Sequence, residues 1–336
     1  MNHAMENILV TRLRFMGDVI LTTPSLYVLR RAFPQAHIAY LTETPYDALL
    51  QAHPWVDAVF GLDRQRGGLS LPWLRELRRR KWDLAIDLFG NPRSALLTWL
   101  SGSRMRIGGD FRGRRLFYTH RIRDDRQVKT AIRFHLNYLQ PLQLPITETA
   151  PLITVTEFEI SQAKTFLAAK DYDLSRPIVG IHPGATWPAK RWFPERFAQL
   201  AAKLHQAGIE VFFTCGPGEE ELVAGVVRRS GLHSTPVEVL SLRQLAAVIR
   251  LFSAFVCNDC GPMHLAPAVG TPTVGIFGPG EPQIWFPYDQ ALGHRLVYHE
   301  VDCSHCHQDF CETMHCMQAI TVEEVYDKVL SSLQRR

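Results

Sequence analysis

Short apolar runs alternate with segments of helical periodicity along most of the chain. The apolar runs cover residues 8–13, 37–42, 57–62, 84–89, 177–184, 209–216, 254–259 and 271–278, and helical patterns cover 23–33, 71–80, 194–208 and 321–336. This alternation predicts parallel strands joined by helical crossovers. We therefore expect an α/β protein with two doubly wound domains, 1–150 and 157–320, a final helix over 321–336, and a ligand cleft between the domains. Residues 142–156, with two prolines and little helical pattern, would be the linker.

The stretch 13–33 places Gly17 and Asp18 where the first predicted strand gives way to a helix. Ligands of open α/β sheets bind at the carboxyl ends of the strands, where Asp18 would lie. Two interpretations stay open from this segment alone. Asp18 caps the helix start, since a carboxylate there accepts free N–H groups and suits the helix dipole, or it is a catalytic carboxylate facing a cleft.

The composition is that of a globular chain, with 46% hydrophobic and 21% charged residues among 336. No apolar run reaches the roughly 18 residues that a membrane span requires, and residues 1–14 do not resemble a secretory signal. These features predict a cytoplasmic protein.

Charge is unevenly distributed. Residues 61–140 contain 18 Lys and Arg against 7 Asp and Glu, a balance of +11 within a net charge of +4, which leaves −7 for the remainder. This basic region is either a solvated surface or a face that meets an anionic partner, such as phosphate, nucleic acid or an acidic membrane.

The ends of the later predicted strands carry the residues best suited to bind an anion. Thr186 and Lys190 follow the strand 177–184, and a lysine at a strand end is well placed to meet a phosphate, unless it is a surface lysine. Asn258, Asp259, Cys260 and Gly261 end another strand, and the helix that begins there, with His264 one turn in, would present free N–H groups to phosphate oxygens. The alternative is a capped helix with a core histidine.

Glu219 and Glu220 open a helix after a third strand end. Acidic residues in a first helical turn are favourable in any case, and they can also accept the hydrogens of two ribose hydroxyls. Classical dinucleotide and P-loop fingerprints are absent from the sequence.

Four cysteines, Cys303, Cys306, Cys311 and Cys316, lie within 14 residues. Their number suits a tetrahedral zinc site, but the later spacings do not match a standard zinc ribbon. A structural metal and a reduced or disulfide-linked loop both remain open. The separate pair Cys257 and Cys260 is interpreted as packing plus loop.

Three segments together, RFMGDVILTTP (14–24), HPGATWPAKRWFPERFAQLA (182–201) and NDCGPMHLAPAVGTPTVGIFGP (258–279), resemble the ADP-heptose:lipopolysaccharide heptosyltransferases, glycosyltransferase family 9. The resemblance covers nearly the whole chain and implies the GT-B arrangement of two Rossmann-like domains. In that arrangement the N-terminal domain binds the acceptor and the C-terminal domain binds the nucleotide sugar. The implied enzyme transfers heptose from ADP-heptose to a lipopolysaccharide inner-core glycolipid. It inverts the anomeric centre without a metal ion, needs no cofactor for catalysis, and acts peripherally at the inner membrane.

The resemblance also implies roles for single residues. Asp18 would be the general base, Thr186 and Lys190 would meet the donor diphosphate, and Asp259 would touch the heptose. Gly261 and His264 would belong to the diphosphate loop, and Glu219 or Glu220 would take the ribose. The family usually has Ser or Thr where this chain has Cys260, and a thiol is the weaker hydrogen-bond donor.

An acidic lipid glycan would give the basic region its partner. The arginines expected to bind it are Arg104, Arg106, Arg112, Arg114 and Arg115. The opening segment resembles most the branch of the family that adds a third heptose. Three alternatives remain: a GT-B transferase with another nucleotide sugar, a non-catalytic nucleotide-sugar or lipid-glycan binding protein, and a nucleic-acid binder. No nucleic-acid motif supports the last.

Overall fold

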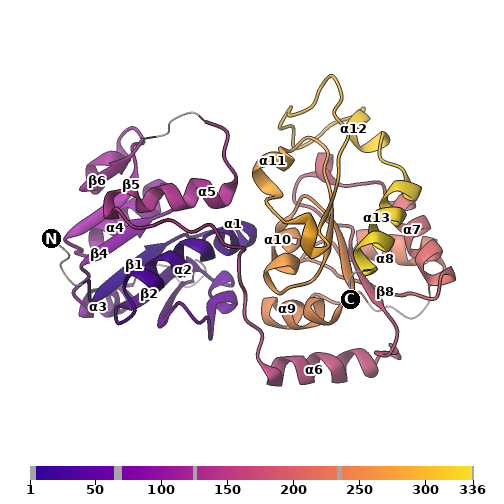
Figure 1. Ribbon diagram of the computed structural model, residues 1–336, viewed down its shortest axis with the longest axis horizontal. Coiled ribbons are helices and arrows are strands. Elements are labelled where there is room, and N and C mark those ends of the chain that lie inside the picture. Colours follow the sequence, from indigo (N-terminus) through magenta and orange to yellow (C-terminus); the bar gives the residue numbers. More distant parts are fainter. Residues whose placement is uncertain (1–4, 64–69, 124–126, 233–236, 335–336) are drawn as a thin grey trace. The chain divides into compact units, whose positions relative to one another are not determined.

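The computed structural model describes residues 5–63, 70–123, 127–232 and 237–334. The chain divides into two compact units, Met1–Thr154 and Val155–Arg336. The boundary falls inside the predicted linker, and residues 143–156 form neither helix nor strand. Each unit is a parallel sheet with helices on it (Figure 1), so the predicted α/β class is confirmed.

Unit 1 contains a six-stranded sheet in the order β3-β2-β1-β4-β5-β6, with every neighbouring pair parallel. Its strands are β1 (Asn7–Thr11), β2 (His37–Glu43), β3 (Ala58–Leu62), β4 (Leu84–Asp87), β5 (Met105–Gly109) and β6 (His120–Ile122). The four strands β1 to β4 coincide with predicted apolar runs. Strands β1, β2 and β4 are buried along nearly their whole length, as expected of continuous apolar runs in a parallel sheet, whereas the edge strand β3 is mostly half-buried.

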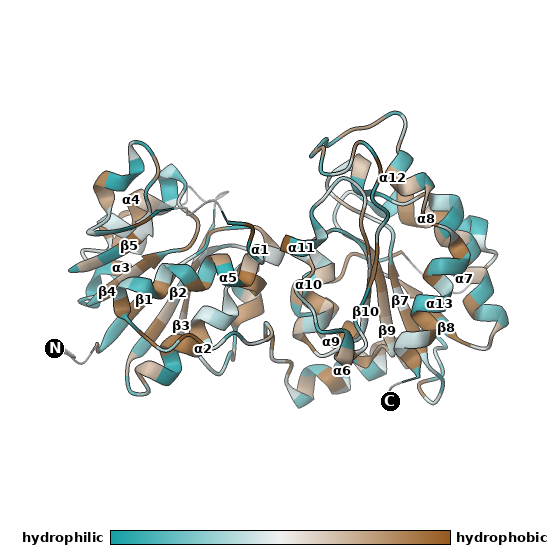
Figure 2. Ribbon diagram, turned by 45° about the horizontal axis from the view of Figure 1, so that its top comes forward, coloured by the Kyte–Doolittle hydropathy of each residue, from teal (hydrophilic) through white to brown (hydrophobic). Residues whose placement is uncertain are grey.

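The helices of unit 1 are α1 (Met16–Leu21), α2 (Thr23–Ala32), α3 (Leu71–Arg79), α4 (Pro92–Leu100) and α5 (Ala131–Leu136), with 3₁₀ turns η1 (Tyr46–Leu50), η2 (Arg114–Phe117) and η3 (Asn137–Leu142). One face of the sheet packs Leu9, Leu41 and Ala85 against Leu77 of α3 and Leu97 of α4. Helices α1, α2 and α5 contact one another. Figure 2 shows the hydrophobic strands at the centre of each sheet.

Unit 2 contains a five-stranded parallel sheet in the order β11-β10-β9-β7-β8. Its strands are β7 (Ile178–His182), β8 (Glu210–Phe213), β9 (Ala254–Asn258), β10 (Thr273–Ile276) and β11 (Arg295–Val297). Its helices are α6 (Glu157–Ala168), α7 (Pro194–Gln206), α8 (Glu220–Ser230), α9 (Leu242–Leu251), α10 (Gly261–Ala268), α11 (Pro282–Trp285), α12 (His315–Gln318) and α13 (Val322–Leu333), with 3₁₀ turns η4 (Pro188–Lys190) and η5 (Gln290–Leu292).

The core of unit 2 lies between the sheet and helices α7, α8 and α13. Phe197 of α7, Val226 of α8 and Val325 of α13 are fully buried there with the inward side chains of the strands. The C-terminal helix therefore belongs to this core. Among the described residues, no helix combines the length and apolarity needed to cross a bilayer.

In each sheet the order of the strands reverses once. In unit 1, β2 and β3 lie on one side of β1 and β4 to β6 on the other, so the reversal is between β1 and β4. In unit 2, β8 lies on one side of β7 and β9 to β11 on the other, so the reversal is between β7 and β9. Ligands of open α/β sheets bind outside the carboxyl ends of the strands at such a point, so each unit has one expected ligand position.

Candidate active site

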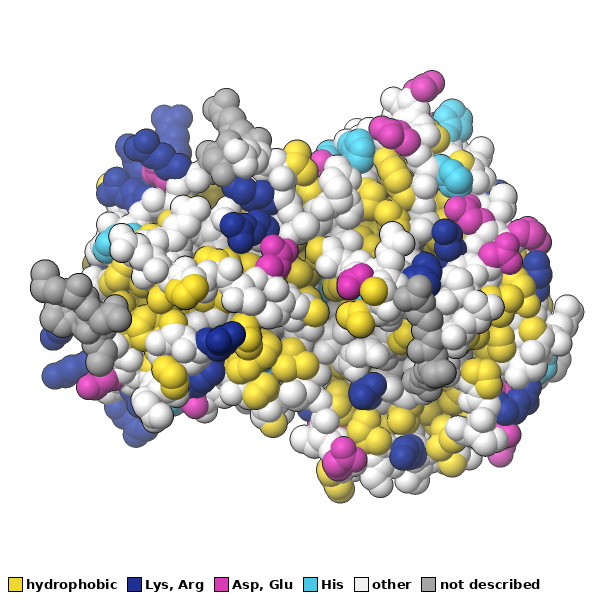
Figure 3. Space-filling model, in the orientation of Figure 1, with side chains coloured by type: hydrophobic (Ala, Val, Ile, Leu, Met, Phe, Trp, Pro, Cys, Tyr) yellow, Lys and Arg dark blue, Asp and Glu magenta, His cyan; other side chains and the backbone are white. Residues whose placement is uncertain are grey.

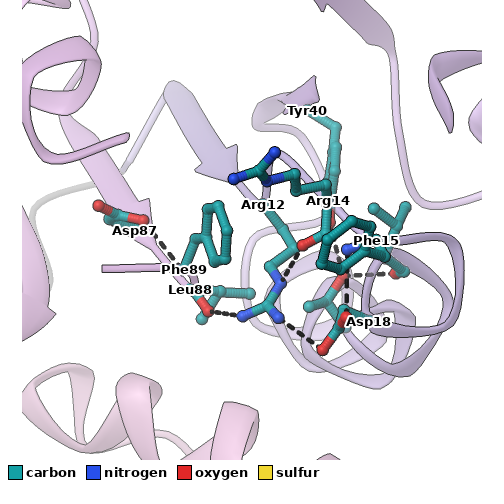
Figure 4. A network of polar contacts seen from close by, with 10 residues as sticks. Arg12, Arg14, Phe15, Asp18, Tyr40, Asp87, Leu88 and Phe89 are labelled. Atoms are coloured by element: carbon teal, nitrogen blue, oxygen red, sulfur yellow. Dashed lines mark hydrogen bonds and ion pairs between the residues drawn. The ribbon is translucent and has the colours of Figure 1, made fainter. Parts of the chain in front are cut away.

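Asp18 lies in the first turn of α1, just beyond the carboxyl end of β1 and therefore at the switch point of unit 1. Its carboxylate accepts two hydrogen bonds (Figure 4): the Phe15 backbone N–H reaches Oδ2 at 3.1 Å, and Nη2 of Arg12 reaches Oδ1 at 2.5 Å. The side chain stays 18% exposed. The capping interpretation thus holds for one oxygen, and the carboxylate is still accessible to a ligand. The partner Arg12 was not among the predicted site residues.

Arg104 and Arg106 do not share this edge of the sheet. Arg104 comes directly before β5, and its backbone N–H bonds the carbonyl of Trp82 ahead of β4, so it lies at the amino ends of the strands. The guanidinium of Arg106 donates to the carbonyls of Ser103 and Phe117, both at 2.7 Å. The structure therefore does not bring these two arginines together with Asp18.

The other three predicted arginines follow the carboxyl end of β5. Arg114 stacks its guanidinium on the Phe111 ring at 4.8 Å. That ring covers Gly90, in the loop after β4, so closely that a Cβ there would lie 2.5 Å from it. This contact places Arg114 near the switch point, while Arg112 and Arg115 are exposed beside it. Figure 3 shows groups of Lys and Arg side chains on the visible face of unit 1.

In unit 2 the loops that follow β7 and β9 are joined at the switch point by the buried Asn258. Its amide donates to the carbonyls of Pro183 and Gly184, at 2.8 and 3.2 Å, and its Oδ1 accepts the Trp192 N–H at 2.9 Å. Sequence reasoning gave Asn258 no role, although a buried amide can hold two loops in register. Thr186 lies in the loop after β7 and is exposed.

Lys190 and Asp259 come from these two loops and form an ion pair. Lys190 Nζ lies 2.6 Å from Asp259 Oδ2, and the side chains are 19% and 6% exposed. Lys190 also lies over the Trp187 ring at 4.7 Å. A largely buried lysine is normally paired with a counterion, and here the counterion is the residue expected to touch the sugar.

The start of α10 follows Asp259 directly. Cys260 is the N-cap and is half-buried, Gly261 is the first helical residue, and the His264 ring is buried with Nδ1 2.6 Å from the Tyr288 hydroxyl. Burial, with a smaller contribution from the Lys190 cation, lowers the pKa of His264 to about 3. The ring is therefore neutral at pH 7, and positive potential at this point comes from Lys190 and the N–H groups of the helix start.

The side chains of Glu219 and Glu220 have different surroundings. Glu219 Oε2 accepts the Gly216 N–H at 2.9 Å and lies 3.4 Å from Nε2 of His182, the last residue of the switch-point strand β7. A Cβ on Gly184 would lie 2.1 Å from the Glu219 carboxyl carbon, so that glycine makes room for the carboxylate. Glu220 is exposed. The residue that turns toward the switch point is Glu219.

The four clustered cysteines are free thiols in the loop before α12 and in its first turn. Cys316 is buried, Cys303 is exposed, and the other two are intermediate. The Met314 N–H bonds Cys311 Sγ at 3.3 Å, which lowers the pKa of Cys311, whereas burial raises the pKa of Cys316. Within the described residues no three His, Cys, Asp or Glu side chains surround one point as metal ligands. This arrangement does not fit a zinc ion, and metal binding there stays a prediction.

Comparison with known proteins assigns the chain to a family. The model of glycosyltransferase family 9 (heptosyltransferase) matches residues 72–316. Lipopolysaccharide heptosyltransferase 3 of Escherichia coli is 27% identical over 298 residues, 83% of this chain and 86% of its own length. The family 9 glycosyl transferase of Veillonella parvula has a similar structure, with a TM-score of 0.86, 28% identity, and coverage of 100% of this chain and 99% of that one. E. coli ADP-heptose lps heptosyltransferase II superposes with a TM-score of 0.82 at 22% identity, over 98% of this chain and 99% of that one. Because the family model spans well over half of the sequence, the chain belongs to glycosyltransferase family 9, the heptosyltransferases.

Proposed function

We propose that this enzyme transfers heptose from ADP-heptose to an inner-core acceptor of lipopolysaccharide, with inversion at the anomeric carbon and without a catalytic metal ion. One observation carries the proposal: unit 1 presents the Asp18 carboxylate at its switch point, and unit 2 presents Lys190 and the α10 start at its own. Family membership supports heptose transfer, and the name of the related E. coli heptosyltransferase II supports ADP-heptose as donor.

Unit 2 would hold the donor through its diphosphate. Lys190 supplies a cation. The first N–H groups of α10 lie at the positive end of the helix dipole and would donate to phosphate oxygens. The Glu219 carboxylate would accept hydrogens from the ribose hydroxyls. Asp259, beside Lys190, would accept hydrogens from the heptose hydroxyls.

Asp18 would take the proton of the acceptor hydroxyl as that oxygen attacks the anomeric carbon of the heptose. The carbon–oxygen bond to the β-phosphate breaks as the new glycosidic bond forms, and its electron pair leaves with ADP. Attack from the face opposite the leaving group inverts the anomeric centre. Lys190 and the α10 N–H groups stabilise the charge that grows on ADP, which is the task that a metal ion performs in other transferases.

The acceptor would bind unit 1. Arg112, Arg114 and Arg115 lie beyond the carboxyl end of β5 and offer guanidinium groups to the phosphates and carboxylates of an inner-core glycolipid. The same charges would draw the enzyme to the cytoplasmic surface of the inner membrane. We therefore expect binding to acceptor micelles to weaken steeply with salt, while ADP binding changes little.

A donor panel tests the proposal. Purified enzyme is incubated with a defined core acceptor and ADP-heptose, ADP-glucose, UDP-glucose or GDP-glucose, and the product is read by mass spectrometry and by NMR of the new anomeric centre. Transfer from ADP-heptose alone, with inversion, is the expected result. Preferred transfer from another nucleotide sugar identifies a different GT-B transferase, and no turnover with any donor identifies a binding protein.

A further inference from the structure

The side chain of Arg12 is committed on all three of its nitrogens (Figure 4). Nη2 donates to Asp18 at 2.5 Å, Nη1 to the carbonyl of Leu88 at 2.8 Å, and Nε to the carbonyl of Arg14 at 3.1 Å. Its guanidinium carbon also lies 4.6 Å from the centre of the Phe89 ring. With 11% of the side chain exposed, Arg12 is held by the protein rather than offered to a ligand.

The Leu88 carbonyl is itself a fixed acceptor, because the loop that carries it is anchored by the buried Asp87. The Asp87 carboxylate accepts the N–H groups of Phe89 and Gly90, at 2.9 and 3.0 Å, together with the hydroxyls of Ser94 and Tyr118, at 2.8 and 2.6 Å. A carboxylate with four donors confines the loop strongly. A continuous chain of contacts therefore runs from the end of β4 through Leu88 to Arg12, and from Arg12 to Asp18.

We propose that Arg12 is a positioning residue that fixes the direction of the Asp18 carboxylate, and this inference rests on the role proposed above for Asp18. A guanidinium is planar and carries its donors in a rigid fork, so its hydrogen bonds hold the carboxylate in one orientation. Its tight bond occupies Oδ1, whereas Oδ2 has a longer bond from a neutral N–H group. Oδ2 is thus the less tightly held oxygen, and the geometry assigns the proton from the acceptor hydroxyl to it.

A second arginine of unit 1 provides a matched control. Arg30 Nη2 lies 2.5 Å from Asp57 Oδ2, which also accepts the backbone N–H of Ile38. This pair copies the chemistry of the Arg12 pair, but Asp57 precedes β3 and lies at the amino edge of the sheet. Loss of Arg30 therefore reports what an ion pair of this kind contributes to folding alone.

The experiment compares Arg12→Ala, Arg12→Lys and Arg30→Ala with the wild type, measuring kcat, the donor KM and the melting temperature. Misplacement of the base lowers kcat of Arg12→Ala by about 100-fold, with the donor KM within about twofold because substrate binding is untouched. Arg12→Lys keeps the positive charge but lacks the forked donors of the guanidinium group, so its kcat lies between those of Arg12→Ala and the wild type. Added guanidinium ion raises the rate of Arg12→Ala. Arg30→Ala keeps the wild-type kcat, and added guanidinium ion does not change its rate.

Asp18→Asn and the double variant Arg12→Ala/Asp18→Asn separate this inference from the proposed function. If Arg12 acts through Asp18, the double variant is no slower than Asp18→Asn, because the two losses are not additive. An inactive Asp18→Asn beside a nearly normal Arg12→Ala overturns the positioning role and leaves the proposed function standing. A fully active Asp18→Asn overturns both. A loss in Arg12→Ala that guanidinium cannot restore and that matches a lowered melting temperature shows that the pair serves folding.

Discussion

From the ion pair between Lys190 and Asp259 we predict that replacing its two members changes the affinity for ADP in opposite directions. In the structure Asp259 is the counterion of Lys190 at 2.6 Å, and both side chains are largely buried. A diphosphate that binds Lys190 must share the ammonium group with this carboxylate or displace it. Lys190→Met should therefore weaken ADP binding, and Asp259→Asn should strengthen it.

The distances set the size of each effect. A hydrogen bond to a charged group contributes about 1.5–3 kcal/mol, so Lys190→Met should raise the Kd for ADP by about 10-fold to 150-fold. Two oxygens bonded to one ammonium nitrogen lie about 4.5 Å apart, and two unit charges at that distance repel by about 4 kcal/mol at an effective dielectric constant of 20. Diphosphate can turn away and solvent screens the pair, so we expect Asp259→Asn to tighten ADP binding by about 10-fold.

Isothermal titration calorimetry with ADP measures both variants. Lys203→Met is the control, since Lys203 pairs with Glu323 at 3.4 Å between α7 and α13, away from the strand ends, and its Kd should equal that of the wild type. The Asp259→Asn variant should also lose heptose transfer while it gains ADP affinity, because Asp259 is expected to hold the sugar. If Asp259→Asn weakens ADP binding as Lys190→Met does, the carboxylate belongs to the ADP site and the counterion argument is refuted.

Three further predictions concern other parts of the molecule. Glu219→Ala should weaken ADP binding by about 10-fold through the lost bonds to the ribose, whereas Glu220→Ala should leave the Kd unchanged. Equal losses of ADP affinity in the two variants would contradict the assignment of the ribose contact to Glu219. Burial lowers the pKa of His53 to about 4. Between pH 6.5 and about 4 the unfolded chain therefore binds a proton at His53 that the folded chain does not bind. The free energy of unfolding falls as the pH drops through this range, by about 2 kcal/mol at pH 5. Thermal unfolding of His53→Gln should therefore depend less on pH than that of the wild type or of the exposed-site control His205→Gln, and an unchanged slope would exclude His53. Elemental analysis of purified protein tests the cysteine prediction: one zinc per chain, lost when Cys303 and Cys306 become serine, would mean that the thiols rearrange around the ion, and no metal would end the zinc hypothesis.

Most strands could be predicted because an apolar run between polar turns is the direct mark of a buried parallel strand. The strand β5 could not, since its sequence MRIGG contains an arginine and two glycines. The glycines are explained by the folded structure alone: a Cβ at Gly108 or Gly109 would lie 2.3 Å from the ring of Tyr118 or Phe111. The edge strand β6 was missed because His120 and Arg121 are exposed, which removes the apolar pattern.

The site residues also divide into those that could be predicted from the sequence and those that could not. Asp18, Lys190 and Asp259 could be selected because they follow predicted strands, and the carboxyl ends of parallel strands share one edge. The choice between Glu219 and Glu220 needed the folded loops, since Gly184 and Gly216 leave space for one carboxylate. Arg12 carries a weak signal in the sequence, a cation directly after an apolar strand, and such a cation normally reads as a surface charge.

The most direct test of the whole account is the rate of heptose transfer by Asp18→Asn, followed by mass spectrometry of a defined core acceptor, with the Kd for ADP measured on the same preparation. The account predicts a loss of turnover of at least about 100-fold with an unchanged Kd and melting temperature, because the amide retains the volume of the side chain but cannot take the proton. Turnover close to that of the wild type in a variant that folds and binds ADP normally would contradict it.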